Sequence, residues 1–89
     1  MQNLKTKAEL ILTELGEQIS HLVGQGQLDS AGFFLDQYIK LSPTSVDRYS
    51  LEAMVQAGAG DYAQATETLK EGLALHPLSF DLLYNLGYL

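Results

Sequence analysis

Apolar residues recur along the chain in steps of three and four, the spacing that places side chains on one face of an α-helix. The pattern predicts a long first helix from about Asn3 to the turn at residues 24–26 (Gly-Gln-Gly). Glycine accepts the left-handed backbone found at helix C-termini, so this turn ends the helix. The apolar stripe of this helix is Leu4, Ala8, Ile11, Leu15, Ile19 and Leu22.

Three more stripes follow, and they alternate with glycine turns and prolines. Pro43 and Pro77 each end a helix, because proline disfavours helical geometry in the residue before it. A second glycine turn, residues 58–60, lies between the two later stripes. The stripes are, in order, Leu28, Ala31, Leu35, Tyr38, Ile39 and Leu41; then Tyr49, Ala53, Met54 and Ala57; then Tyr62, Ala65, Leu69, Leu73 and Leu75.

The segments after the two prolines begin in the same way. Ser45 and Ser79 each offer a hydroxyl as an N-cap, and Asp47 and Asp81 each add a carboxylate in the first turn, where the helix dipole favours it. Residues 80–89 therefore begin a further helix. The sequence predicts an all-α fold of antiparallel helical hairpins with about five helices.

The chain also repeats itself. A shift of 34 places brings residues 12–45 onto residues 46–79. The coinciding residues are turn glycines, helix-ending prolines, N-cap serines and apolar contact residues. A fixed period of this size indicates stacked supersecondary units. We predict one domain, residues 1–89, with one repeat at 12–45 extended forward to about residue 3, a second at 46–79, and the first helix of a third at 80–89. The coinciding pairs are Gly24 and Gly58, Gly26 and Gly60, Ala31 and Ala65, Leu35 and Leu69, Leu41 and Leu75, Pro43 and Pro77, and Ser45 and Ser79.

The second repeat resembles the tetratricopeptide repeat (TPR) family, whose spacing is matched by Tyr49, Ala53, Ala65, Leu69 and Pro77. The turn at residues 60–62 and the segment 83–88 are also similar to that family. The chain departs from its pattern at Gln18, Ile19 and Gly72, where the family usually has leucine, a small residue and alanine. The resemblance implies hairpins stacked as a right-handed superhelix, as in the N-terminal TPR segment of a longer bacterial protein.

The resemblance also implies a concave groove lined by the outgoing helices. Met54, Tyr84 and Tyr88 are candidate anchors there. The alternative, that Tyr84 and Tyr88 pack on a neighbouring helix, is favoured because aromatic residues on a helical stripe usually belong to the core. The candidate partner-binding residues are Thr13, Ser20, Asp47, Ser50, Met54, Asp81, Tyr84 and Tyr88.

Some TPR proteins clamp the terminal carboxylate of heat-shock chaperones with lysine, arginine and asparagine side chains. The corresponding positions here are Gly16, Ser20, Leu51, Asp81 and Asn85. Only Asn85 has suitable polarity, and Asp81 would repel a carboxylate. We therefore reject a chaperone clamp.

Composition narrows the choice of partner. The chain has no cysteine and a net charge of −6, from eleven carboxylates against five lysines and arginines. Thiolate metal sites and disulfides are excluded, and nucleic acids and anionic membranes are disfavoured. No signal peptide or membrane span is recognisable, so we expect a cytoplasmic protein. His21 and His76 are too isolated to form a metal site, and His76 is expected to be solvated or to cap its helix.

No nucleophile, metal or phosphate-binding pattern is present, so we expect no catalytic, cofactor-binding or metal-binding residue. The leading expectation is a scaffold that binds a protein or peptide. The alternative is a non-catalytic N-terminal recognition or assembly domain of a larger bacterial enzyme, such as a glycosyltransferase. The apolar end, with Leu82, Leu83, Leu86 and Leu89, suggests an excised piece of a longer protein, or a homodimer or swap through the last helix.

Overall fold

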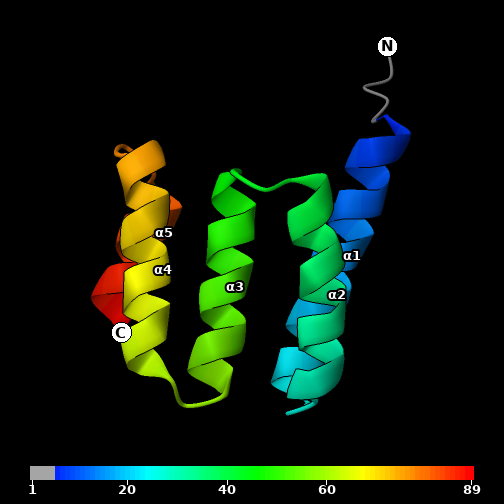
Figure 1. Ribbon diagram of the computed structural model, residues 1–89, viewed down its shortest axis with the longest axis horizontal. Coiled ribbons are helices and arrows are strands. Elements are labelled where there is room, and N and C mark those ends of the chain that lie inside the picture. Colours follow the sequence, from blue (N-terminus) through cyan, green and yellow to red (C-terminus); the bar gives the residue numbers. More distant parts are fainter. Residues whose placement is uncertain (1–5) are drawn as a thin grey trace.

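The computed structural model describes residues 6–89, and this part of the chain contains five α-helices and no strand. The predicted all-α fold is confirmed. The helices form antiparallel hairpins joined by short turns (Figure 1). Their bounds are α1 (Lys7–Gly24), α2 (Leu28–Leu41), α3 (Val46–Gly58), α4 (Tyr62–Leu75) and α5 (Phe80–Tyr88).

The first helix begins at Lys7, and Thr6 caps it. The Thr6 hydroxyl accepts from the Glu9 backbone amide at 3.2 Å, and the Glu9 carboxylate accepts from the Thr6 amide at 3.0 Å. This reciprocal pair is a capping box, which satisfies two amides at the helix start. The forward extension to about Asn3 and the predicted stripe residue Leu4 lie outside the described residues.

Both glycine turns have the predicted left-handed residue. Gly26 has a φ of 76° and Gly60 a φ of 83°. The amide of Gln27 donates to the Leu22 carbonyl, and the amide of Asp61 donates to the Gln56 carbonyl, both at 2.9 Å. These bonds belong to Schellman motifs, which close the exposed carbonyls at a helix C-terminus. The two hairpins therefore turn by the same local chemistry.

The predicted caps and stops are also present. The hydroxyls of Ser45 and Ser79 each accept a backbone amide at 3.2 Å, from Arg48 and Leu82. The residue before each proline has a non-helical backbone, with φ −147° at Ser42 and φ −130° at His76.

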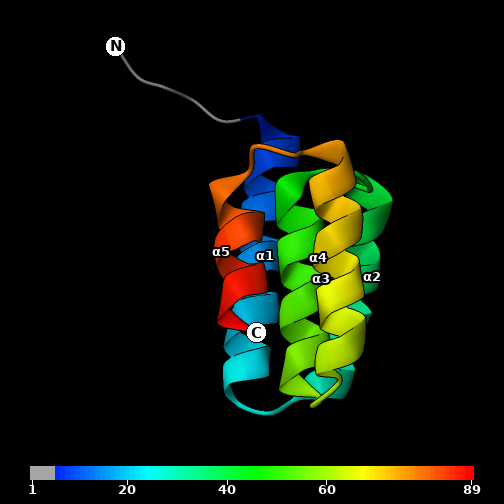
Figure 2. The same ribbon diagram turned by 90° about the vertical axis from the view of Figure 1, so that its left-hand side faces the viewer.

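Helix α3 is the centre of the molecule and packs against each of the other four helices. A quarter turn shows α1 and α5 on one side of α3, with α2 and α4 on the other (Figure 2). Two clusters of buried side chains meet at α3. The first consists of Ile19, Leu22, Ala31, Leu35, Tyr38 and Leu51. The second consists of Tyr49, Ala53, Ala65, Leu69 and Leu82.

Six predicted stripe residues are exposed: Ala8, Ile11, Leu41, Met54, Tyr62 and Leu75. Ile11, Leu41 and Leu75 are 49%, 58% and 55% exposed, and Tyr62 is 59% exposed. Leu41, Leu75 and Tyr62 are terminal residues of their helices, and Ile11 lies in the first turns of α1, which extend past α2 (Figure 1). The stripes are therefore covered only where a neighbouring helix runs alongside.

The apolar end is less open than we expected. Leu82 is completely buried against α3 and α4, and Leu86 is partly buried in the same cluster. Leu83 and Leu89 remain 46% and 43% exposed. One face of α5 is thus packed and another is open.

Candidate interaction groove

A hollow of about 720 Å³ lies along α1 and α3. Its carboxylates are Glu9, Glu17 and Asp47, and it also includes the small residues Gly16 and Ser20. We call it the acidic hollow. No residue of its lining carries a positive charge. The remaining lining residues are Leu12, Thr13, Tyr38, Ser42, Ser45, Ser50 and Leu51.

A second hollow, of about 560 Å³, lies between the C-terminal halves of α3 and α5 and reaches Val23 of α1. We call it the apolar hollow. Its exposed large side chains are Met54, Tyr62, Tyr88 and Leu89, at 37%, 59%, 84% and 43%. Ser50 lines both hollows, so the two are neighbours, and we call them together the interaction groove. The other residues of the apolar hollow are Ala53, Ala57, Gly58, Tyr62, Leu69, Asn85 and Leu89.

Most of the candidate binding residues line this groove. Thr13, Ser20 and Asp47 line the acidic hollow, Met54 and Tyr88 the apolar hollow, and Ser50 both. Asp81 lies elsewhere. It shares a third, open hollow with Asp47 at the N-terminal ends of α5 and α3.

Tyr84 lines none of these three hollows. The preference for core packing of Tyr84 and Tyr88 is wrong, because their side chains are 75% and 84% exposed. Helix α5 packs through Leu82 and Leu86, and residues two positions from these point away from the core.

Three groove residues outside the candidate binding set also shape its chemistry. Tyr38 belongs to the return helix α2 and is only 4% exposed, yet it lines the acidic hollow. Glu17 is an exposed carboxylate of α1 that lines the acidic hollow. Asn85 donates its side-chain amide to the Ser50 hydroxyl at 2.9 Å, which links α5 to α3 in the middle of the groove. Helical spacing gives no signal for these contacts between elements.

The side chains that line the acidic hollow carry only negative charge. The described residues include Lys7, Lys40, Arg48 and Lys70, and none of them lines either hollow of the groove. Burial raises the pKa of Tyr38, the nearby Asp47 carboxylate raises it further, and a hydrogen bond with Ser45 acts in the opposite direction. The neutral phenol is therefore retained to higher pH than usual beside the Asp47 charge.

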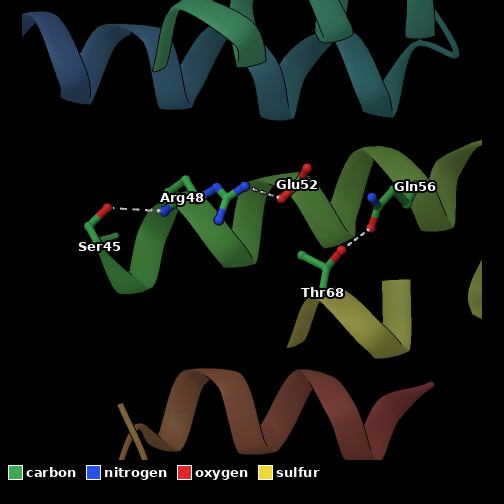
Figure 3. A network of polar contacts seen from close by, with 5 residues as sticks. All are labelled: Ser45, Arg48, Glu52, Gln56 and Thr68. Atoms are coloured by element: carbon green, nitrogen blue, oxygen red, sulfur yellow. Dashed lines mark hydrogen bonds and ion pairs between the residues drawn. The ribbon is translucent and has the colours of Figure 1, made fainter. Parts of the chain in front are cut away.

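Arg48 is occupied outside the groove. It forms an ion pair with Glu52 at 3.0 Å, one turn along α3 (Figure 3). Its guanidinium also lies over the Tyr49 ring, 4.3 Å from the centroid. Burial raises the pKa of Glu52, Arg48 lowers it, and the charges of Glu71 and Asp36 raise it again. Since Asp36 is on α2 and Glu71 on α4, this pair belongs to the packing side of α3.

A second polar contact in the same view joins α3 to α4. The Thr68 hydroxyl donates to the Gln56 side-chain carbonyl at 2.7 Å (Figure 3). Thr68 is 2% exposed, so this bond satisfies a hydroxyl that water does not reach. It stabilises the hairpin and contributes nothing to the groove.

His76 has a partner that the sequence did not indicate. Its ring Nε2 lies 2.6 Å from the Thr44 carbonyl, which joins the loop after α4 to the loop after α2. The expected role at the helix C-terminus belongs instead to its backbone amide, which donates to the Gly72 carbonyl at 2.8 Å.

Within residues 6–89, no three His, Cys, Asp or Glu side chains are grouped closely enough to hold a metal ion. Over the same range, no helix is both long and apolar enough to cross a bilayer. Comparison with protein-family models, with curated proteins and with solved structures gives no match. The TPR resemblance therefore remains a prediction from the 34-residue period and the spacing of Tyr49, Ala53, Ala65, Leu69 and Pro77.

Proposed function

We propose that the chain is a TPR-type protein-interaction module that binds a peptide segment of a partner protein in the interaction groove. The observation that supports this most directly is the apolar hollow. Met54 and Tyr88 stay exposed there beside the buried floor residues Ala53 and Leu69. An apolar depression rimmed by polar residues is typical of a surface that contacts another protein.

The chemistry of the groove suits contact rather than catalysis. Its polar groups are hydroxyls, carboxylates, one side-chain amide and the phenols of Tyr38, Tyr62 and Tyr88. The hollows are shallow and open, whereas general acid or base catalysis needs groups held against a substrate in a shielded site. The groove carboxylates also oppose binding of a terminal carboxylate, which agrees with rejecting the chaperone clamp.

Peptide display on the immobilised protein tests the proposal. Peptides enriched on the wild type should bind Met54→Glu about tenfold more weakly, a loss of about 1.4 kcal/mol that is typical of a buried contact at an interface. Leu41→Glu is the matched control, because it adds the same charge at a residue that is 58% exposed and lines neither hollow. Circular dichroism should show both variants folded.

Equal binding of the enriched peptides to wild type, Met54→Glu and Leu41→Glu would place their contact outside the groove. That result would overturn the proposal.

A further inference from the structure

We infer that the bound segment is extended and basic, with a lysine or arginine in the acidic hollow and a bulky apolar side chain in the apolar hollow. This inference rests on the proposed function and specifies its partner. It is carried by the two neighbouring hollows that share Ser50, and by the charges and small residues that line the first.

The carboxylates of the acidic hollow indicate that the partner carries a positive charge there. Glu9 and Glu17 of α1 and Asp47 of α3 line one hollow that has no cation in its lining. The Arg48 charge is held by Glu52 on another side of α3. A peptide cation between Glu17 and Asp47 gains attraction to both carboxylates, whereas a peptide carboxylate is repelled by both. The net charge of −6 adds long-range steering of the same sign.

The small residues of the acidic hollow favour an extended backbone. Gly16, Ser20 and Ser50 are small, so a peptide backbone can approach the helices closely. An extended backbone has amides and carbonyls that need partners, and the Ser20 hydroxyl can serve either kind of group. A helix satisfies those groups internally and would gain little from the hydroxyl. The lining therefore suits an extended segment better than a helix.

The distance between the hollows sets the spacing in the partner. Asp47 and Met54 are seven residues apart on α3, which is roughly 10 Å at 1.5 Å per residue, and Ala57 is about 15 Å from Asp47. An extended chain rises about 3.3 Å per residue, and side chains at even spacing share a face. A cation and an apolar side chain four positions apart in an extended peptide are about 13 Å apart and lie on the same face. This spacing therefore matches the separation of the two hollows and places both side chains toward the protein.

The probe is a fluorescently labelled nine-residue peptide, Arg-Ser-Thr-Ser-Phe-Ser-Thr-Ser-Arg, which presents the required spacing in both chain directions. We expect saturable binding by fluorescence anisotropy, weakened as salt is raised. Replacing both arginines by glutamate, or the phenylalanine by alanine, should each weaken binding about tenfold or more, which is about 1.4 kcal/mol.

The protein side is tested with the double variant Glu17→Gln, Asp47→Asn. The control is Asp29→Asn, Glu67→Gln, which removes the same charge from exposed positions on α2 and α4 outside the groove. We expect about a tenfold loss for the groove variant, near 1.4 kcal/mol, and less than a twofold loss for the control. Equal losses in the two variants would mean nonspecific attraction and would overturn the inference.

The outcome separates this inference from the proposed function. If display enriches neutral or acidic peptides that still lose affinity for Met54→Glu, the groove binds peptides and the basic, extended partner is wrong. If the arginine probe binds Met54→Glu as well as it binds the wild type, the groove is not the docking surface and both proposals fail.

Discussion

The two hairpins share a 34-residue frame and the same turn chemistry, yet they fill the space between their helices differently. In α1–α2 the contact residues include Ile19 and Tyr38, both almost fully buried. The residues 34 places later are Ala53 and Gly72. The first hairpin thus places bulk where the second has almost none.

The second hairpin recovers that volume from another position. Tyr49, at the place of Leu15, packs directly over Gly72. A Cβ added to Gly72 would lie 2.8 Å from the Tyr49 Cβ and Cγ atoms and 2.9 Å from Leu82 Cδ1. Gly72 departs from the alanine of the family pattern because Tyr49 and Leu82 occupy the space that a methyl group would need.

The polar positions differ as well. Leu22 and Phe34 of the first hairpin correspond to Gln56 and Thr68, whose side chains are hydrogen bonded at 2.7 Å. An apolar pair and a satisfied polar pair can therefore occupy equivalent positions. In this molecule the two hairpins turn in the same way, although different side chains fill the space between their helices.

The largest expected effect comes from giving the first hairpin the small residue of the second. Ile19→Ala should lower the free energy of unfolding by about 2–5 kcal/mol, because the first hairpin has no other side chain to fill the cavity. Urea denaturation followed by circular dichroism measures it. Ile11→Ala, at a half-exposed position of the same helix, is the control and should cost far less. Equal losses would show that Ile19 does not support the first hairpin as the structure indicates.

A smaller effect is expected at Gly72. Gly72→Ala should destabilise the protein by about 1–3 kcal/mol through overpacking against Tyr49 and Leu82. Gly32→Ala in α2 is the matched control, since no atom lies within 4 Å of the added methyl group. That variant should stabilise the protein by about 0.5–1 kcal/mol, as alanine usually does within a helix. The same thermal or urea unfolding experiment compares the two, and stabilisation by both would contradict the close packing at Gly72.

The smallest effect concerns Glu52, whose equivalent in the first repeat is Gln18. Burial raises the folded-state pKa of Glu52 above the ordinary 4.5. At pH values between the ordinary pKa of 4.5 and the raised folded-state pKa, Glu52 binds more protons in the folded state than in the unfolded state. Its contribution to the free energy of unfolding therefore falls as pH rises through that range. Glu52→Gln should therefore flatten the decline in unfolding free energy from about pH 4.5 upward.

The measurement is urea denaturation at a series of pH values, with Glu67→Gln on the exposed face of α4 as the control. If Glu52→Gln and Glu67→Gln give parallel curves, then Glu52 is not the source of the pH dependence.

The sequence predicted well those features that depend on neighbours along the chain. The caps at Ser45 and Ser79 and the left-handed residues Gly26 and Gly60 use only local hydrogen bonds and backbone geometry, so their residue types reveal them. The helix period likewise indicated the faces that Leu35 and Leu69 bury.

It predicted less well what depends on neighbours in space. The period assigns a face to Leu41 and Tyr88, but it does not say whether another helix covers that face. The bond from His76 to Thr44 spans 32 positions and has no local signal. For the groove, the TPR resemblance implied a lining from the outgoing helices, and the structure adds Tyr38 from α2 to the acidic hollow.

The position of α3 has a consequence for how the molecule unfolds. Because α3 contributes Leu51 to the cluster of α1 and α2, and Tyr49 and Ala53 to the cluster of α4 and α5, unfolding of α3 opens both clusters. Stacked repeats usually exchange stability only with their nearest neighbours, and longer arrays can lose cooperativity. In this short stack a single shared helix couples the two ends, so α1–α2 and α3–α4 should melt together, while the outer turns of α1 and α5 fray independently.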